Sequence, residues 1–511
     1  MGNGLAQSIK PVPGSFTVFT IRFHGKQGAL SVLHGSKEVI ETIKEAIKTK
    51  WTGGLQTDQS PHSVVHVFKL GGYNVDTFWT GSQAAVFFCE MLRSLAKRGW
   101  HLTAAPDMFL TLDDAELIFT KGEAIAESRV FALRIADHHA FKVTCADGAV
   151  RQAIRDAITK VTPLKDEKKI SDHQYLYTME GCPWRAGDDI VQREIGVNVL
   201  SNMLKFMAQQ DYGLVAPACI DGDQDTMFFE KKSHMRHDVK YATIALHELE
   251  SMLLFRFPNE TLDSVKKMAE IDWPLGLANW KRLSENSIEC KLRGTPWRQH
   301  GQDLDLVIST KLFVLSLFEK LSMRGWLLVC SADISQEIND KSLFIFGSDE
   351  LRSRRFAGLQ PASHNKLWLL KMGEEEQQAV DKVLSRTLGA SGILAQETHA
   401  GNTIEYELAG SPWRPTENAD TLIARHVISV TVATMCARGW RVACCADLME
   451  DYQTITSEKQ VQVVEKKKSN SKAASMIGLN SGRKATMKQQ VIKTKTDQAC
   501  DLHLIVFVRD H

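Results

Sequence analysis

Gly294-Thr295-Pro296-Trp297-Arg298 opens a stretch that closes on Arg324-Gly325-Trp326, with an apolar helical run between its two tryptophans. A second copy of this stretch runs from Gly410-Ser411-Pro412-Trp413-Arg414 to Arg438-Gly439-Trp440. The two more divergent copies are Gly181-Cys182-Pro183-Trp184-Arg185 to Asp211-Tyr212-Gly213, and Phe78-Trp79-Thr80-Gly81 to Arg98-Gly99-Trp100. The sequence therefore predicts four repeat units.

The residues at both ends of the repeated stretch have a structural explanation. At its end, a basic residue in the last helical turn faces the negative end of the helix dipole, and the glycine can take the left-handed conformation that stops the helix. At its start, the proline ends a strand and the tryptophan fills the core. Asp303 and Asp420 are then placed to cap the helices that follow.

The spacing of the repeats defines their size. Trp184 and Trp297 are 113 positions apart, and Trp297 and Trp413 are 116 apart. A period this long predicts tandem domains rather than short solenoid repeats. We expect an α+β fold with four tandem β-α-β-α-β-β units of about 110 residues. The predicted parts are an N-terminal arm (1–15) and unit one (16–125), unit two (126–235), unit three (236–352) and unit four (353–511, with a disordered basic insertion at 456–499).

The hydrophobic pattern places the elements of each unit. In unit one, Phe19, Ile21 and Phe23 alternate with polar residues as in a half-buried strand. Ser36 is placed to cap a helix that continues to Trp51. The first strand of unit four is predicted at Leu367 to Leu370.

Composition restricts the class of protein. The chain has 511 residues, of which 43% are hydrophobic and 24% charged, with a net charge of +1. This charge gives no reason to expect a nucleic-acid partner. The ten cysteines show no Cys-x-x-Cys spacing, which is typical of a reduced, cytosolic chain. No segment is predicted to span a membrane.

The N-terminal residues indicate a lipid anchor. Gly2 follows the initiator methionine, and Ala6 stands where myristoylation motifs prefer Ser or Thr. Gly2 is therefore a candidate for N-myristoylation. A frayed, glycine-rich terminus without modification is an equally good interpretation.

Unit four contains a long basic insertion. No acidic residue occurs between Lys466 and Thr496, and we expect this segment to be disordered. Each basic residue near an anionic membrane contributes about 1 kcal/mol, so the segment can supplement a weak lipid anchor. A merely solvated linker is the alternative. The predicted membrane-binding residues are Lys466, Lys467, Lys468, Lys472, Arg483, Lys484 and Lys488.

The sequence shows no complete catalytic motif. There is no Gly-x-Ser-x-Gly elbow, no P-loop and no set of metal ligands at a spacing that closes a site. We therefore expect no enzymatic activity, no cofactor and no metal. Arg185, Arg298 and Arg414 follow the repeated tryptophans and are possible anion contacts, although pairing with nearby acids is favoured.

Two parts of the chain resemble the raftlin family of acylated, raft-associated membrane adaptors. They are Met1-Gly2-Asn3-Gly4-Leu5 and the closing module, in which Met435-Cys436-Ala437-Arg438-Gly439-Trp440-Arg441-Val442 leads to the strand Leu502 to Val508. The palmitoylated cysteine of that family is replaced here by Asn3. The resemblance implies a non-enzymatic scaffold on the cytoplasmic face of membranes, affecting receptor signalling or trafficking.

The resulting functional hypothesis is an N-myristoylated, membrane-associated adaptor in lipid rafts of the cell membrane. Its expected partners are anionic membrane lipids and other proteins. The alternative is a cytoplasmic, soluble multidomain protein that binds a small ligand or a protein in clefts between repeat units.

Overall fold

Four six-stranded antiparallel sheets make up the protein in a computed structural model. The strand order of the first sheet is β3-β4-β2-β1-β6-β5, and the other three sheets repeat it with their own strands. This confirms the predicted α+β class and the four repeat units. The structure describes residues 17–24, 27–72, 83–109, 116–187, 189–219, 225–233, 235–298, 303–332, 342–389, 391–415, 418–449 and 502–510.

Each unit follows the same order of elements, β-β-α-β-β-α-β-β. Unit one contains β1 (Val18–His24), β2 (Ala29–Leu33), α2 (Lys37–Lys50), β3 (Leu55–His62), β4 (Val65–Leu70), α4 (Gln83–Ala96), β5 (Trp100–Ala104) and β6 (Glu116–Lys121). Unit two contains β7 (Val130–Asp137), β8 (Ala140–Thr144), α5 (Gly148–Thr159), β9 (Leu164–Ser171), β10 (Gln174–Met179), α6 (Ile190–Gln209), β11 (Tyr212–Cys219) and β12 (Asp225–Lys231).

The other two units repeat this order. Unit three contains β13 (Tyr241–His247), β14 (Ser251–Phe255), α7 (Asn259–Ile271), β15 (Leu277–Arg282), β16 (Ser287–Leu292), α8 (Leu304–Ser322), β17 (Trp326–Ala332) and β18 (Leu343–Ser348). Unit four contains β19 (Arg354–Ala362), β20 (Lys366–Leu370), α9 (Glu374–Leu388), β21 (Ile393–His399), the 3-10 turn η1 (Ala400–Asn402), β22 (Thr403–Leu408), α10 (Asn418–Cys436), β23 (Arg441–Ala446) and β24 (Leu504–Asp510).

The structure adds two strands to each predicted unit. One is the outer edge strand β3, β9, β15 or β21, whose residues are mostly exposed and polar and so lack the alternation that marks a half-buried strand. The other is one strand of the first hairpin, β2, β8, β14 or β19. In unit four the predicted first strand, Leu367 to Leu370, is the second strand β20, and β19 precedes it.

The tryptophans that open the repeated stretch are buried as predicted wherever the structure describes them. Trp184, Trp297 and Trp413 are each exposed by 2% or less. In all three, the backbone N–H of the tryptophan donates to a carbonyl in the turn between the first two strands of the same unit, at 3.1 to 3.2 Å. Trp79 lies outside the described residues.

The glycines that follow the long helices also have the predicted backbone conformation. Gly99, Gly325 and Gly439 have φ angles of 75°, 75° and 80°, in the left-handed region that glycine adopts without a Cβ clash. Asp303 caps α8 by accepting from the N–H of Asp305. The corresponding prediction for Asp420 is wrong, because this residue lies inside the first turn of α10.

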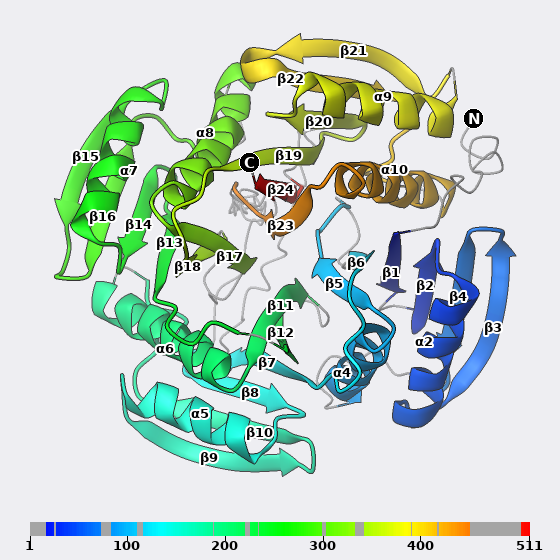
Figure 1. The fold of residues 1–511 in the computed structure, drawn as a ribbon, viewed down its shortest axis with the longest axis horizontal. Coiled ribbons are helices and arrows are strands. Elements are labelled where there is room, and N and C mark those ends of the chain that lie inside the picture. Colours follow the sequence, from blue (N-terminus) through cyan, green and yellow to red (C-terminus); the bar gives the residue numbers. More distant parts are fainter. Residues whose placement is uncertain are drawn as a thin grey trace, which may run out of the picture.

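The four units form a closed ring. The long second helix of each unit packs against the first strand of the next unit, so that α4 contacts β7, α6 contacts β13 and α8 contacts β19. The fourth contact, between α10 and β1, joins the last unit to the first (Figure 1). The inner edge strands β5, β11, β17 and β23 contact one another in sequence around the centre.

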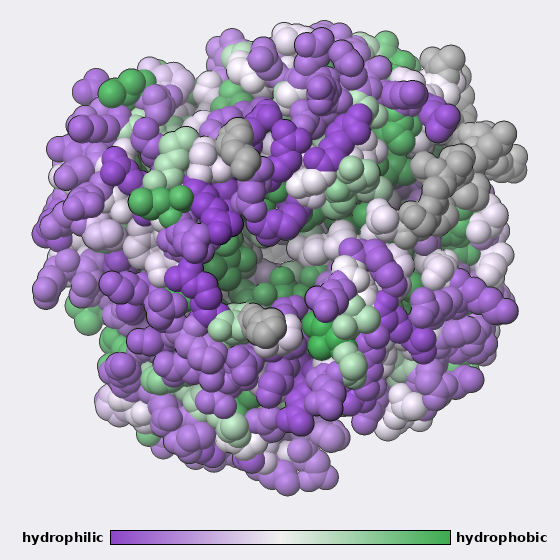
Figure 2. Space-filling model, viewed as in Figure 1, coloured by the Kyte–Doolittle hydropathy of each residue, from purple (hydrophilic) through white to green (hydrophobic). Residues whose placement is uncertain are grey.

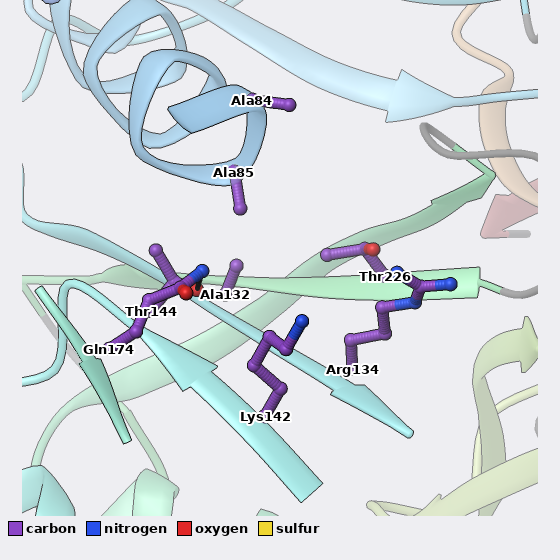
Figure 3. Close-up of a pocket in the computed structure, with 8 residues that line it drawn as sticks. All are labelled: Ala84, Ala85, Ala132, Arg134, Lys142, Thr144, Gln174 and Thr226. Atoms are coloured by element: carbon purple, nitrogen blue, oxygen red, sulfur yellow. Dashed lines mark hydrogen bonds between the residues drawn. The ribbon is translucent and has the colours of Figure 1, made fainter. Parts of the chain in front are cut away.

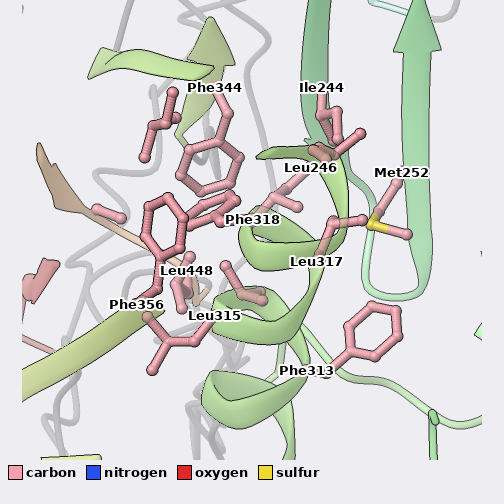
Figure 4. Close-up of a cluster of buried hydrophobic side chains, with 14 of the residues drawn as sticks. Ile244, Leu246, Met252, Phe313, Leu315, Leu317, Phe318, Phe344, Phe356 and Leu448 are labelled. Carbon is pink, nitrogen blue, oxygen red and sulfur yellow. The ribbon is translucent and has the colours of Figure 1, made fainter. Parts of the chain in front are cut away.

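The hydrophobic cores run across the unit boundaries. The core of unit three, for example, includes Phe318 and Phe344 of its own elements together with Phe356 of β19 and Leu448, which follows β23. Figure 4 shows the side chains of Phe318, Phe344, Phe356 and Leu448 gathered on one side of α8. The Phe318 ring lies 5.0 Å from that of Phe344 and 5.7 Å from that of Phe356. Because each core is completed by the following unit, the ring is stabilised as a whole.

Among the helices that the structure describes, none is both long enough and apolar enough to cross a membrane.

Candidate functional site: the junctions between units

The four junctions have the same backbone geometry but different chemistry. On the long helix, one position lies fifteen residues before the aromatic residue that begins the next strand, Trp100, Tyr212, Trp326 or Trp440. This position faces the first hairpin of the following unit. It is occupied by Ala85, Val197, Lys311 and Arg425.

The junction between units four and one holds a buried ion pair. Arg425 is 3% exposed, and its Nε donates to Oε1 of Glu116, which is fully buried, at 2.7 Å. The same guanidinium donates to the hydroxyls of Ser31 and Thr20, at 2.8 and 3.3 Å, and to the carbonyl of Ser31 at 3.0 Å. Breaking such a pair costs about 3 to 5 kcal/mol, because the remaining charge stays buried. We call this contact the closure junction.

Three histidines surround the buried pair of the closure junction. His34 and His426 form a hydrogen bond of 2.6 Å between their ring nitrogens, and His24 bonds the Ser31 hydroxyl at 2.8 Å. Burial, followed by the positive charges of Arg22 and Arg425, lowers the pKa of His24 to about 3. Burial and then His426 and Arg425 lower the pKa of His34 to about 3. Burial also lowers the pKa of His426 to about 4, with a smaller effect of His62. These imidazoles are therefore held neutral.

The junction between units one and two contains a cavity of about 20 Å³. The side chains of Arg134, Lys142 and Thr226 line it from β7, β8 and β12, and Ala84 and Ala85 line it from α4 (Figure 3). Gln174 and Thr144 complete the lining, and the amide of Gln174 donates to the Thr144 hydroxyl at 3.0 Å. None of the described lining residues is acidic. We call this the cationic cavity.

Two thiols meet at the same junction. Cys89 of α4 is buried, and burial together with its hydrogen bond to Cys145 raises the pKa of its thiol. The pKa of Cys145 is lowered, because Cys89 hydrogen-bonds to it and Lys50 and Arg93 add positive charge. Cys145 and His34 occupy the same place after the second strand of their units, and both have left-handed φ angles, of 63° and 61°.

The remaining two junctions carry other residues at the equivalent helix position. Between units two and three, Val197 packs with Leu253 and Phe255 in a small apolar cluster. Between units three and four, Lys311 is fully buried. Sequence reasoning missed these differences, because the positions are recognised as equivalent only after the units are aligned on the structure.

A larger cavity of about 180 Å³ lies between the inner edge strands. Each of these strands carries a β-bulge at the equivalent place, and the bulged residues Thr103, Val215, Val329 and Ala443 all line the cavity. Bulges re-aim side chains and interrupt strand pairing. Figure 2 shows that the middle of one face of the ring is hollowed and that hydrophobic residues gather there.

The three predicted anion contacts lie in equivalent turns of different units. The backbone N–H of each donates to the carbonyl three residues earlier, at 3.0 to 3.1 Å. Arg185 is exposed, with Nη1 3.3 Å from Nε2 of His138. Arg298 is half-buried and Arg414 is exposed. None of them lines either of the two cavities described above.

The predicted membrane contacts lie outside the described residues. They are Gly2, Lys466, Lys467, Lys468, Lys472, Arg483, Lys484 and Lys488.

Three side chains of the types that bind metal ions lie close together on the outer strands of unit four. The sequence analysis missed this cluster. One ligand atom from each of Glu397, His399 and Glu405 falls within 4.8 Å of the others. Glu405 is buried and is already held by Lys366 at 2.6 Å and by the indole N–H of Trp368 at 2.6 Å. Its negative charge is therefore balanced without an ion.

The fold and the junctions define a repeat protein in which α+β units complete one another's cores. A family model of an uncharacterised domain matches the chain three times, over residues 17–119, 240–347 and 355–464. These matches cover more than half of the chain, and the protein belongs to this domain family. Unit two has the same strand order, although the family model does not match it. No curated protein and no solved structure matches the chain.

Proposed function

We propose that the protein is a non-enzymatic adaptor that associates with the cytoplasmic face of membranes through two signals. The first signal is a myristoyl group on Gly2, and the second is the basic segment that begins at Lys466. The ring of four units is the scaffold that carries both and presents surfaces to protein partners. The resemblance to the raftlin family adds lipid rafts, receptor signalling and trafficking as the setting.

The observation that supports this proposal is the location of the described residues next to the two segments. Val18 is at the start of β1 and follows the N-terminal arm, and Leu502 follows the basic insertion. Both side chains are buried in the same hydrophobic cluster, which joins units one and four. Met449, at the other end of the insertion, is also buried. Val18 and Leu502, the described residues next to the arm and to the end of the insertion, therefore lie in one region of the molecule.

Neither signal is sufficient alone. A single myristoyl chain binds membranes with an association constant of about 10⁴ M⁻¹, which leaves the protein exchanging with the cytosol. Three basic residues at an anionic surface add about 3 kcal/mol, which strengthens binding more than a hundredfold. The two signals together give stable association.

Partitioning onto vesicles tests the proposal. Acylated protein is mixed with vesicles that contain phosphatidylserine, and three variants are compared: Gly2→Ala, replacement of Lys466, Lys467 and Lys468 by Gln, and a control with the same change at Lys165, Lys168 and Lys169 on the exposed edge strand β9. We expect the first two to lose binding and the control to retain it. High salt should imitate only the lysine replacement. Equal binding of all proteins at low salt would exclude the two-signal account.

A second candidate function is a soluble protein that binds a small ligand between units. The cationic cavity between units one and two favours it. The mass of the N-terminal peptide separates the two functions, because myristoylation adds the acyl chain to Gly2 and the soluble alternative leaves it unmodified.

A further inference from the structure

We propose that Cys89 of α4 and Cys145, which follows β8, form a site of reversible oxidation, where a peroxide joins the two thiols in a disulfide that links unit one to unit two. This inference does not rest on membrane association, since it concerns a contact between two described units.

The contact between these cysteines is one version of a contact that recurs at every junction. The residue that follows the second strand of each unit has a left-handed φ angle, which is uncommon for residues other than glycine. These residues are His34, Cys145, Arg256 and Lys371, with φ angles of 61°, 63°, 65° and 53°. In each unit this residue reaches the long helix of the preceding unit.

Hydrogen bonds show where these side chains end. The partners at three junctions are His426 of α10 for His34 (2.6 Å), Asn198 of α6 for Arg256 (3.0 Å), and Ser316 and Glu319 of α8 for Lys371 (2.8 and 2.7 Å). Between units one and two, Cys145 hydrogen-bonds to Cys89 and packs against the hydrophobic cluster that contains it. Because a thiol has a single polar atom, this hydrogen bond places the two sulfur atoms in contact.

The surroundings of the two thiols differ. Cys145 is half-buried, and the hydrogen bond from Cys89 lowers the pKa of its thiol. The positive charges of Lys50 and Arg93 also lower this pKa, whereas burial and Glu90 oppose the shift. Cys89 is 2% exposed, and burial raises the pKa of its thiol. Since the thiolate is the reactive form, peroxide attacks at Cys145 and Cys89 completes the bond.

The oxidation proceeds in two steps. The Cys145 thiolate attacks one oxygen of hydrogen peroxide, which breaks the O–O bond, forms a sulfenic acid and releases hydroxide. The sulfur of Cys89 then attacks the sulfenic sulfur, and the sulfenic hydroxyl leaves with the Cys89 proton as water. The two sulfurs together lose two electrons, which the peroxide accepts. A dithiol reductant returns both residues to thiols by exchange.

The disulfide ties α4 to the first hairpin of unit two. Because Cys89 and Cys145 are 56 positions apart, the bond restricts the unfolded chain and stabilises this junction. In a reducing compartment such a bond persists only while oxidant is present. Burial raises the pKa of three other cysteines, which keeps their thiols protonated and slow to react. They are Cys290, Cys436 and Cys444.

Peptide mapping of the full chain tests the proposal. Hydrogen peroxide is added until the exposed Cys182 is oxidised, the remaining thiols are blocked with N-ethylmaleimide, and the chain is digested with trypsin without reductant. Trypsin leaves each cysteine alone in a peptide, residues 70–93 for Cys89 and 143–151 for Cys145. We expect these two peptides to be joined, with the loss of two hydrogen atoms in mass, and to separate after treatment with dithiothreitol.

Three variants define the role of each thiol. Cys145→Ser should abolish the linkage and leave Cys89 as a thiol. Cys89→Ala should leave Cys145 as a sulfenic acid that dimedone traps, and should raise the pH midpoint of its reaction, because the hydrogen bond that lowers its pKa is lost. Cys182→Ser is the matched control and should form the linkage as the parent does.

The parent protein alone decides whether the linkage forms, so the test does not depend on the folding of a variant. The proposal is overturned if the two peptides stay separate in protein whose Cys182 is oxidised, or if Cys145 joins another cysteine instead. An unchanged pH midpoint in folded Cys89→Ala protein would also contradict it. None of these results depends on Gly2 or on the basic insertion, so they do not decide membrane association.

Discussion

The closure junction and the cationic cavity are the same contact made with different residues. In both, a long helix packs against the first hairpin of the next unit, and an arginine lies in the middle of the first strand. At the closure junction, Arg425 fills the space and forms an ion pair with Glu116. At the cationic cavity, Ala85 leaves the space open and Thr226 provides no charge. The repeated backbone therefore sets where a site can form. The side chains at two positions, Arg425 or Ala85 on the helix and Glu116 or Thr226 on the strand, decide whether the protein fills it.

The two junctions also contain different titratable side chains. The closure junction carries two buried histidines, His34 and His426, and the half-buried His24, which respond to pH. The cationic cavity adjoins Cys89 and Cys145, whose pKa values shift in opposite directions: burial raises the pKa of Cys89 above its usual value of 9.0, and the hydrogen bond from Cys89 lowers that of Cys145. Each junction can thus be perturbed separately.

The largest expected effect is a loss of stability in mild acid that originates at the closure junction. The folded pKa values of His24, His34 and His426, about 3, 3 and 4, lie below the unfolded value of 6.5. The unfolded chain therefore binds more protons below pH 6.5, and folding stability falls as the pH falls from 6.5 towards 4. Each histidine contributes about 1.4 kcal/mol per pH unit, or about 4 kcal/mol for three at pH 5.5.

Urea unfolding at pH 7.5 and 5.5 measures this loss. The double variant His34→Gln and His426→Gln should lose about one third as much stability as the parent between the two pH values, because only His24 then titrates at this junction. An unchanged pH dependence in the double variant would place the acid sensitivity elsewhere.

The second-largest expected effect is the loss of stability when the arginine of the closure junction is introduced at the equivalent position of the cationic cavity. Ala85→Arg adds a third cation beside Arg134 and Lys142, and an arginine introduced here without an acidic partner of its own should cost about 3 kcal/mol. Adding Thr226→Glu to Ala85→Arg recreates the ion pair of the closure junction and should restore most of that loss. Chemical denaturation of the two variants measures both values. If the added glutamate rescues nothing, the two junctions are not equivalent.

The smallest effect concerns the hydroxyl of Thr226. Thr226→Val keeps the shape of the side chain and removes a buried group that has no partner among the described residues, so the protein should gain about 1 kcal/mol in buffer without carboxylate or phosphate. The same change at Thr20, whose hydroxyl accepts from Arg425, should be destabilising. Thermal unfolding of the two variants compares them directly, and equal signs would count against the assignment.

The sequence predicts the parts of this fold that depend on local pattern. The tryptophans at 184, 297 and 413 and the left-handed glycines recur at fixed spacing, because each unit needs the same core plug and the same helix stop. The outer strands β3, β9, β15 and β21 were missed, because their pairing with one neighbour leaves most side chains in solvent and removes the periodic signal.

The closure of the ring and the junction sites depend on contacts far apart in the chain. Arg425 and Glu116 are separated by 309 positions, and nothing near either residue identifies the other. The cationic cavity is even harder to predict, since it arises from what Ala85 and Thr226 do not provide. A signal for it exists only in the comparison of units: an arginine on the first strand of units one and two, with its acidic neighbour present in one and replaced in the other.

The central claim is that unit four closes on unit one through Arg425 and Glu116, and a double-mutant cycle on this pair tests it most directly. The unfolding free energies of the parent, Glu116→Ala, Arg425→Ala and the double variant are measured at pH 7.5. Close, buried charge pairs show coupling of about 1.5 kcal/mol or more, and we expect at least that value here. Additive effects, with coupling within about 0.5 kcal/mol of zero, would mean that the two residues do not touch and that the ring is open.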